Sequence, residues 1–292
     1  MKPQAAIFEP IPDHARHLFF DLKPAADPRA ALRALAAACD GTSAVLGIGV
    51  KVAETLGVDL AGLRGFPELP DARPPIPATQ HALWLWLRGD EPGDLLLQGH
   101  ALQALAAPAL TLTQAIVGFR HQDYRDLTGY EDGTENPKDE AAVEAAVAQG
   151  QGAGIDGSSF AAVQQWLHDF PKFDAMPRTE QDNCFGRRRD DNEELEDAPE
   201  SAHVKRTAQE DFEPEAFVVR RSMPWVAGAD AGLVFLAFGK SFDAYEAQLR
   251  RMTGHDDGIS DALFRFTRPL TGGYYWCPPL GAAGIDLQAL GL

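Results

Sequence analysis

The alternation of strand-like and helix-like segments constrains the fold of this chain more than any other feature of its sequence. Apolar runs with a two-residue or continuous pattern predict strands, and Ala- and Leu-rich stretches with a helical period predict helices. In the first half we expect strands at residues 16–22, 42–50, 81–87 and 109–118, and helices at residues 30–39 and 94–106. The proline-rich residues 67–77 are expected to form an extended loop between two β-α-β halves. This order predicts the split βαβ arrangement of a ferredoxin-like α+β unit.

The second half of the chain repeats this pattern more loosely. Its expected strands are residues 160–170, 217–220, 232–239 and 274–276, and its expected helix is residues 241–252, with Ser241 as N-cap. The Gln-Gln-Trp centre of the first of these strands would also suit a helix, and the charge-dense residues 187–200 are expected to form a solvated loop. The Gly-rich residues 150–157 separate an N-terminal unit, 1–150, from a C-terminal unit, 151–292. We therefore expect an α+β fold in which two ferredoxin-like units share a layered sheet core.

Composition and charge exclude several classes of function. With 26 Lys and Arg against 43 Asp and Glu, the formal net charge is −17, which argues against binding to nucleic acid or to an anionic membrane surface. The sequence has no apolar run of the roughly 18 residues that a membrane span needs, and its start shows no signal-peptide pattern. Its widely spaced cysteines fit reduced thiols rather than disulfides or a cysteine zinc site. These features predict an acidic, globular, cytoplasmic protein.

Residues 129–137 (GYEDGTENP) are the first place where chemistry could reside. Gly133 can adopt a positive φ, and the carboxylate of Asp132 can accept backbone N–H bonds in such a turn. On composition alone, a plain loop that closes the first unit is a sufficient explanation. The density of polar groups at a junction between units also fits a cleft, and Glu131, Asp132 and Glu135 could instead bind a divalent cation.

Two further places combine polar residues with the ends of expected strands. His203 follows Pro199 in a loop that leads back toward a strand, whereas no other histidine is paired with histidine or cysteine at metal-site spacing. A zinc or iron site built from several histidines is therefore not expected. Arg220 and Arg221 end a β-rich run, so one should point to the interior and its neighbour to solvent. An inward arginine needs a carboxylate or an anionic ligand, and a salt bridge at the strand end is the simpler interpretation.

Taken together and in this order, these segments resemble the dye-decolorizing peroxidases, and among them the short bacterial members called type B. Residues 129–133 match the GxxDG signature of that family, and the extension DGTENP is typical of its bacterial members. The resemblance covers nearly the whole chain. Its other matching segments, in chain order, are residues 185–187, 192–195, 201–204, 220–225 and 232–254.

The resemblance implies a dimeric α+β barrel fold of the haem peroxidase type, with one haem b per chain. It implies that His203 is the single axial ligand of the haem iron, and that Asp132 and Arg220 lie on the opposite face of the ring. Asp132 would move a proton between the two oxygens of hydrogen peroxide, and Arg220 would stabilise the charge that develops there. Arg221 is the alternative for this arginine, although alignment on the Met-Pro pair that follows favours Arg220.

Further haem contacts follow from the same resemblance. Arg187 is the expected partner of a haem propionate, and Gly133 belongs to the loop beside the cofactor. Asp261 is the candidate acceptor for the second ring nitrogen of His203, although a helix N-cap role would explain the same residue equally well. Ser222 stands where many relatives have Asn, a difference expected to alter the rate rather than the reaction.

The implied activity is the reduction of hydrogen peroxide with oxidation of dyes, phenolics or similar one-electron donors. Homo-oligomers are usual among such proteins, so a dimer or a larger assembly is expected. The alternative on the same fold is a protein that carries haem or releases its iron. Because aspartic acid titrates at about 3.9 and histidine at about 6.5, the use of an aspartate as the base predicts the fastest dye oxidation at roughly pH 4–5.

Overall fold

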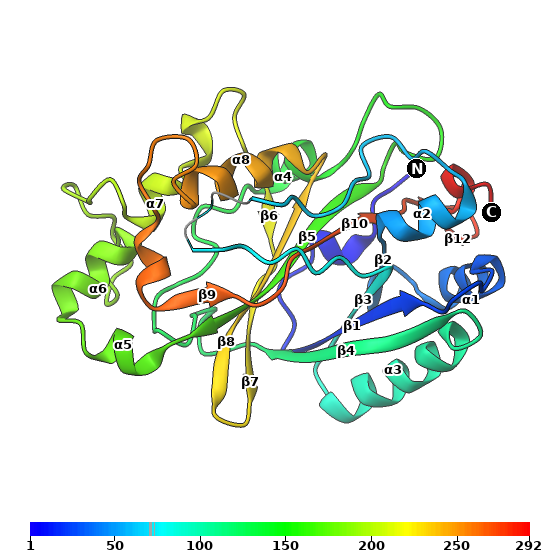
Figure 1. The fold of residues 1–292 in the computed structure, drawn as a ribbon, viewed down its shortest axis with the longest axis horizontal. Helices are drawn as coiled ribbons and strands as arrows, with labels where there is room; N and C mark the ends of the chain where they lie inside the picture. The colour runs from blue at the N-terminus through cyan, green and yellow to red at the C-terminus, as the bar shows by residue number, and fades with distance from the viewer. Residues whose placement is uncertain (70–71, 73) are drawn as a thin grey trace.

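The structure is a computed structural model that describes residues 1–69, 72 and 74–292 (Figure 1). Its strands are β1 (His14–Leu22), β2 (Ala44–Ile48), β3 (Leu83–Gly89), β4 (Leu110–Phe119), β5 (Ser159–His168), β6 (Val219–Arg220), β7 (Met223–Ala227), β8 (Asp230–Gly239), β9 (Thr267–Pro269), β10 (Gly273–Cys277), β11 (Leu280–Gly281) and β12 (Gly284–Ile285). Its α-helices are α1 (Arg29–Ala38), α2 (Val50–Leu56), α3 (Pro92–Ala106), α4 (Asp139–Ala146), α5 (Phe170–Asp174), α6 (Arg178–Phe185), α7 (His203–Arg206) and α8 (Asp243–Met252). Short 3-10 helices are η1 (Ala5–Ile7), η2 (Gln209–Asp211), η3 (Ala262–Arg265) and η4 (Gln288–Leu290).

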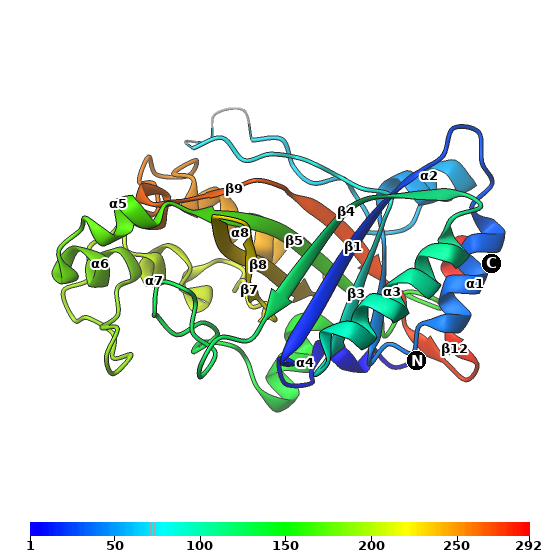
Figure 2. The same ribbon diagram turned by 90° about the horizontal axis from the view of Figure 1, so that it is seen from below.

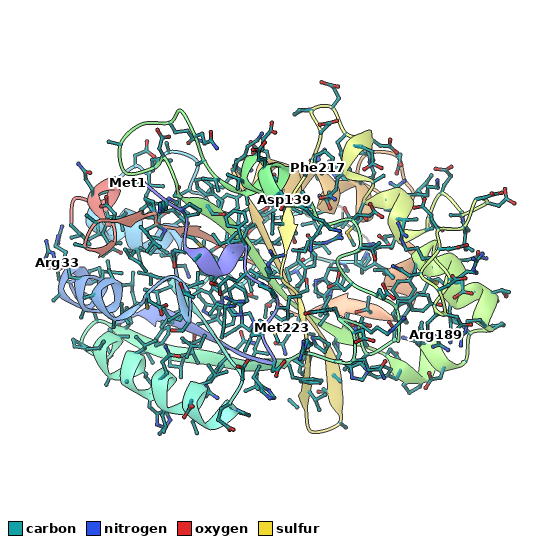
Figure 3. All side chains as sticks on the ribbon, turned by 180° about the vertical axis from the view of Figure 1, so that it is seen from behind. Met1, Arg33, Asp139, Arg189, Phe217 and Met223 are labelled. Carbon is teal, nitrogen blue, oxygen red and sulfur yellow. The ribbon has the colours of Figure 1, made fainter. Side chains whose placement is uncertain are left out.

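The first unit contains β1 to β4 in the order β4-β1-β3-β2, with antiparallel neighbours throughout. β1 lies between β3 and β4, and Leu18 at its centre is opposite Leu85 and Ala115. α1 and α3 contact each other, and α3 packs on β1 and β3, so that these helices cover one side of the sheet (Figure 2). Arg33 lies on the exposed side of α1 (Figure 3). This is the ferredoxin-like arrangement predicted for the first half.

The second unit has the same strand order. Its strands lie in the order β10-β5-β8-β7, so that the first strand again lies between the third and the fourth. β7 pairs with β4 through Trp225 and Gly118, and β10 pairs with β2 through Trp276 and Ile48. These two junctions close the sheet into a barrel. The predicted α+β fold of two ferredoxin-like units in a barrel is therefore confirmed.

Alternate residues of these strands fill the interior of the barrel, because successive side chains of a strand point to opposite faces. The indoles of Trp84 and Trp86 stack on the ring of His17, with centroid distances of 6.0 and 6.3 Å. Both indoles also contact Phe238 of β8, and Trp84 contacts Tyr275 of β10. Burial lowers the pKa of His17 to about 3, so this imidazole is neutral at pH 7. The centre of the barrel is thus an aromatic core around a neutral imidazole.

The structure differs from the sequence-based expectations at several element ends. The strand expected at residues 42–50 is shorter: β2 ends at Ile48, Gly49 is the N-cap of α2, and the helix begins at Val50. β7 is a separate strand that the sequence pattern does not predict. The predicted N-cap of α8 is wrong by one residue: Phe242 occupies that position, and Ser241 instead accepts a hydrogen bond from the backbone N–H of Asp243.

The ambiguous residues 160–170 form a strand rather than a helix, up to residue 168. Gln164 and Gln165 are buried there. β5 is paired with β8 on one side, and on the other with β10 and then with β9. Residues 187–200 contain turns and one isolated bridge, as expected for a loop. In the proline-rich residues 67–77, the described positions are neither helix nor strand, and residues 70, 71 and 73 lie outside the described residues.

The Gly-rich residues 150–157 connect α4 to β5. α4 precedes this connection in the sequence, yet it contacts β6 and β8 of the second unit. Its residue Ala145 accepts a hydrogen bond of 2.8 Å from the backbone N–H of Lys240. The division of the chain into residues 1–150 and 151–292 stays a prediction.

At Gly232, β8 lies so close to β5 that there is no room for a side chain. A Cβ atom at this position would lie 2.0 Å from the carbonyl oxygen of Trp166. We expect Gly232→Ala to lower the free energy of unfolding by about 1–3 kcal/mol, because the two strands have to separate. Urea unfolding followed by tryptophan fluorescence measures this change. Gly93→Ala, in the exposed first turn of α3, is the control and should be neutral or stabilising by up to about 1 kcal/mol. Equal destabilisation by both substitutions would contradict the prediction.

Candidate active site

A cavity is lined by residues of β5, β8 and α8, on the face of the two strands that points away from the barrel interior. The ribbon shows where these three elements lie in the fold (Figure 1). Its empty volume is about 920 Å³, including its open mouth. Its apolar lining comes from β5, β8, α8, η3 and their neighbours and includes Trp166, Phe185, Leu233, Phe235, Leu249, Met252, Leu263 and Phe266. A cavity of this size and composition can enclose a large, flat, mainly apolar ligand.

A more polar cavity of about 960 Å³ adjoins the first. Polar and charged side chains from residues 131–135 and 187–194 form much of its lining. Asp132, His203 and Arg220 line both cavities, so the structure brings these residues together at the junction. Gly133 and Arg187 line the polar cavity alone.

His203 is the first residue of α7. Its Nδ1 lies 2.7 Å from Oδ2 of Asp261, whose side chain is fully buried, while 28% of the His203 side chain is exposed. The other carboxylate oxygen of Asp261 accepts a hydrogen bond from the backbone N–H of Leu263 at the start of η3. Asp261 therefore makes both of the contacts that the sequence left open. Nε2 of His203 has no hydrogen-bond partner among the described residues, which leaves it available to a ligand.

The loop of the GxxDG signature presents Asp132 from a narrow turn. The backbone N–H of Asp132 donates a hydrogen bond of 3.1 Å to the carbonyl oxygen of Tyr124. The next residue, Gly133, has a φ of 83°, and a Cβ atom there would lie 3.0 Å from the side-chain nitrogen of Asn136. Both the backbone conformation and this close approach therefore require glycine.

Asn136 ties this loop to β6. Its Oδ1 accepts a hydrogen bond of 2.7 Å from the backbone N–H of Arg220, and its Nδ2 donates one of 3.1 Å to the carbonyl oxygen of the same residue. Gln209 forms a second bridge, because it donates to the carbonyl oxygen of Glu135 and accepts from the backbone N–H of Val218. No sequence pattern singles out Gln209, and only its place in DGTENP points to Asn136.

Arg220 and Arg221 point to different parts of the molecule. Arg220 lines both cavities, and its Nε is buried with no hydrogen-bond partner among the described residues. Arg221 lines neither cavity and is only partly exposed. Burial, followed by the positive charge of Arg88, lowers the pKa of Arg221 to about 10. The expectation that the second arginine faces solvent is therefore wrong.

Arg187 lies on the wall of the polar cavity, where two carboxylates hold it. Its Nη2 is 2.6 Å from Oε1 of Glu135 and 3.1 Å from Oε2 of Glu194. Glu131 is paired in the same way with Arg125, at 2.8 Å. Across the described ranges, no group of three or more His, Cys, Asp or Glu side chains is placed to hold a metal ion. The structure therefore gives the divalent-cation alternative no support.

A second carboxylate–imidazole pair lies on the wall of the apolar cavity. Oδ2 of Asp126 is 3.0 Å from Nε2 of His168, and Oδ1 accepts hydrogen bonds from the backbone N–H and the hydroxyl of Thr128. Burial by itself raises the pKa of Asp126, but the hydrogen bond and charge of His168 and the bonds from Thr128 outweigh it and hold this pKa below its usual value. The sequence offers no signal that singles out this pair.

The cavity lining fits a porphyrin. The apolar walls can enclose the ring, and the arginines of the polar cavity can bind its carboxylate substituents. His203 offers one ring nitrogen as a ligand for the iron, because the other is engaged by Asp261. Buried donors of the lining, Nε of Arg220 and Nε2 of Gln164, have no partner among the described residues and can serve a bound group.

The fold and this site define a haem-binding enzyme built on an α+β barrel. Residues 123–282 match the family described as Dyp-type peroxidase, C-terminal. The dye-decolorizing peroxidase of Mycolicibacterium paratuberculosis is 32% identical over 244 residues, which cover 81% of this chain and 69% of that protein. The corresponding protein of Mycobacterium tuberculosis is 31% identical over 225 residues, covering 75% of this chain and 67% of its own. This chain belongs to the dye-decolorizing peroxidase family.

Solved structures agree with this assignment. A putative dyp-type peroxidase protein from Shewanella oneidensis superposes with a TM-score of 0.88 at 27% identity, covering 99% of this chain and 97% of that one. DyPB from Rhodococcus jostii RHA1 gives a TM-score of 0.86 at 26% identity, covering 95% of this chain and 96% of its own. A variant of the latter protein is known in complex with heme. The present protein is accordingly a peroxidase with haem as its cofactor.

The lowered pKa of Asp126 predicts how stability depends on pH. A carboxyl group whose pKa is lower in the folded than in the unfolded state stabilises the fold above the unfolded-state pKa, and this contribution is lost as the pH falls through the folded-state pKa. We expect Asp126→Asn to lower the free energy of unfolding at pH 7, and the difference from wild type to shrink below about pH 4. Urea midpoints measured across this pH range test the prediction. Asp123→Asn, exposed in the same loop, is the control. A difference between Asp126→Asn and wild type that does not vary with pH would contradict the prediction.

Proposed function

We propose that this protein is a type B member of its family that reduces hydrogen peroxide at the junction of the two cavities and oxidises dyes, phenolics or similar one-electron donors. One observation carries the proposal: a carboxylate-backed imidazole meets a second carboxylate and a guanidinium around a cavity large enough for haem. The alternative of haem transport or iron release has no observation in its favour, because those functions need no acid–base residue beside the haem. Homo-oligomeric assembly and a cytoplasmic location stay predictions from the sequence.

His203 would hold the haem iron through Nε2 of its imidazole. Asp261 accepts the Nδ1 proton of the imidazole, so the ring stays in the tautomer whose Nε2 lone pair can bind a metal. Because Asp261 is fully buried and also accepts a bond from Leu263, the orientation of the imidazole is fixed. When bound, the haem supplies an iron that exchanges electrons with peroxide and with the donor.

Asp132 moves one proton during peroxide reduction. As a carboxylate it accepts a proton from one oxygen of hydrogen peroxide and returns it to the other oxygen, which leaves as water when the O–O bond breaks. The complete reaction consumes two protons and two electrons for each peroxide and yields two water molecules. Two donor molecules supply the electrons, one each. The hydrogen bond from the backbone of Asp132 to Tyr124 supports this role, because it fixes the turn that carries the carboxylate.

Arg220 stabilises the negative charge that develops on the leaving oxygen. Asn136 clamps the backbone of Arg220 on both sides of the residue, and Nε of its guanidinium bonds to no described residue. The side chain is thus anchored at its base and has a donor left for an anionic oxygen. Arg187 would bind a haem propionate from the polar cavity, in competition with Glu135 and Glu194, and Gly133 keeps the loop that lines this cavity in its tight turn.

No helix in the described part of the chain combines the length and the apolar character needed to traverse a lipid bilayer.

Substitution of Asp132 tests the proton-transfer role. We expect Asp132→Asn to lower the second-order rate constant for reaction of the holoenzyme with hydrogen peroxide by about 100-fold or more, because an amide cannot accept the proton. Stopped-flow absorbance in the Soret region measures this rate constant. Asp123→Asn removes an exposed carboxylate from the same loop and should change the rate constant less than about twofold. A wild-type rate constant for Asp132→Asn would refute the role of Asp132.

Substitution of His203 tests haem ligation separately. We expect His203→Ala to lose most of its haem on purification and to bind added haem roughly 10- to 100-fold more weakly, because the imidazole that ligates the iron is removed. Haem titration followed in the Soret band measures this affinity. The matched control is His100→Ala, on the exposed side of α3, which should bind haem like the wild type. A normal Soret band and normal affinity in His203→Ala would show that another residue holds the iron.

A further inference from the structure

The buried pair of Asp126 and His168 has no part in the proposed reaction, although both residues line the apolar cavity. His168 lies at the end of β5, and its two ring nitrogens have different partners. Nε2 is 3.0 Å from Oδ2 of Asp126, and Nδ1 is 2.8 Å from the hydroxyl oxygen of Thr267 in β9. The ring is also enclosed by the edges of Phe170 and Phe266, at centroid distances of 5.8 and 6.2 Å.

The hydrogen-bond donors of this network can be counted. The hydroxyl of Thr267 has a single proton. When this proton is used for the bond to the carbonyl oxygen of Leu167, at 3.0 Å, the hydroxyl oxygen acts as acceptor towards His168. Nδ1 of His168 therefore carries a proton. An ionised Asp126 is an acceptor only, so Nε2 must carry a proton as well. All bonds of the network are satisfied together when His168 is an imidazolium.

Asp126 and His168 can both be charged in this buried place only because of the hydrogen bonds that surround them. The side chains of His168 and Asp126 are 6% and 12% exposed, so neither ion is well solvated. A buried ion pair is stable when hydrogen bonds satisfy the remaining lone pairs and protons. Here the second carboxylate oxygen of Asp126 accepts two bonds from Thr128, and the second nitrogen of His168 donates to Thr267. Removal of either partner would leave a buried charge without compensation.

The same pair fixes the turn that carries Asp132. The backbone N–H of Asp126 donates to the carbonyl oxygen of Tyr130 at 2.8 Å, and the backbone N–H of Asp132 donates to Tyr124 at 3.1 Å. Asp126 and Asp132 therefore belong to one hydrogen-bonded turn. His168 joins this turn to the sheet through the carboxylate of Asp126.

We propose that His168 is a buried imidazolium and a positioning residue for the peroxide reaction, which holds the turn of Asp132 in place through Asp126. This inference rests on the proposed function, because it assumes that Asp132 moves the proton. This role requires no contact of the imidazolium with peroxide or haem. It acts through the carboxylate that anchors the turn.

The protonation state is tested on the wild-type holoenzyme without reference to turnover. Histidine labelled with ¹⁵N is observed by NMR in the reduced carbon monoxide complex, which is diamagnetic, at about pH 7.5, where an exposed histidine is mainly neutral. We expect one histidine with protons on both ring nitrogens, and we expect its signals to disappear in His168→Gln. If the signals lost in that variant come from a ring with one proton, the inference is overturned.

The positioning role is tested by a double-mutant cycle on the peroxide rate constant. His168→Leu removes both donors and should slow the reaction about tenfold with its haem content unchanged. His168→Gln keeps one donor that can reach Asp126 and should recover the rate to within about threefold of the wild type. In the Asp132→Asn background, His168→Leu should have less than about a twofold further effect.

Two outcomes of this cycle would overturn the inference alone. One is a wild-type rate constant for His168→Leu, and the other is an equal slowing by His168→Leu in the presence and absence of Asp132. A wild-type rate constant for Asp132→Asn itself would instead overturn the proposed function. The NMR result keeps the inference testable if His168→Leu does not fold, because it uses the unmodified side chain.

Discussion

The antiparallel pairing of β5 with β8 is the constraint on which the rest of the structure depends. Because side chains alternate along a strand, one face of this pair of strands lines the core of the barrel and the other face lines the cavity. Val163 and Phe238 point into the aromatic core of the barrel, whereas Gln164, Trp166 and Phe235 line the cavity on the other face. A shift of one residue in this register would exchange the two sets, place polar groups in the barrel and remove the wall of the haem site.

Hydrogen bonds between residues that are far apart in the sequence hold the segments of the site together. Asn136 joins the loop of Asp132 to the backbone of Arg220, and Asp261 holds the ring of His203. Each of these contacts buries polar groups that would be costly to leave without partners, so the local geometry has few alternatives. Among the buried side-chain atoms without a described partner, Nε of Arg220 and Nε2 of Gln164 belong to the cavity lining, where a ligand can engage them.

The placement of individual arginines near the cavities cannot be read from the net charge of the protein, which is strongly negative. Although the formal net charge is −17, arginines approach both the cavities and the end of the barrel. Arg187 is balanced by Glu135 and Glu194, while Arg220 faces the cavities and Arg221 lies near Arg88. Two neighbouring arginines thus have different environments, because Arg220 is the last residue of β6 and the next side chain along the extended backbone points to the opposite face.

The sequence by itself determined the two ferredoxin-like patterns, the GxxDG loop and the set of His203, Asp132 and Arg220 as candidates, because local periodicity and short motifs carry that information. It left the choice between acceptor and helix cap at Asp261 open, and the structure has both contacts at once. Only the tertiary structure decided that β4 pairs with β7 and β2 with β10. Each of these junctions, which close the barrel, rests on a single pair of residues, and such a pair leaves no pattern in the sequence. The tertiary structure also placed His168 beside Asp126, because a contact between residues on separate segments follows from strand register and leaves no periodic pattern in the chain.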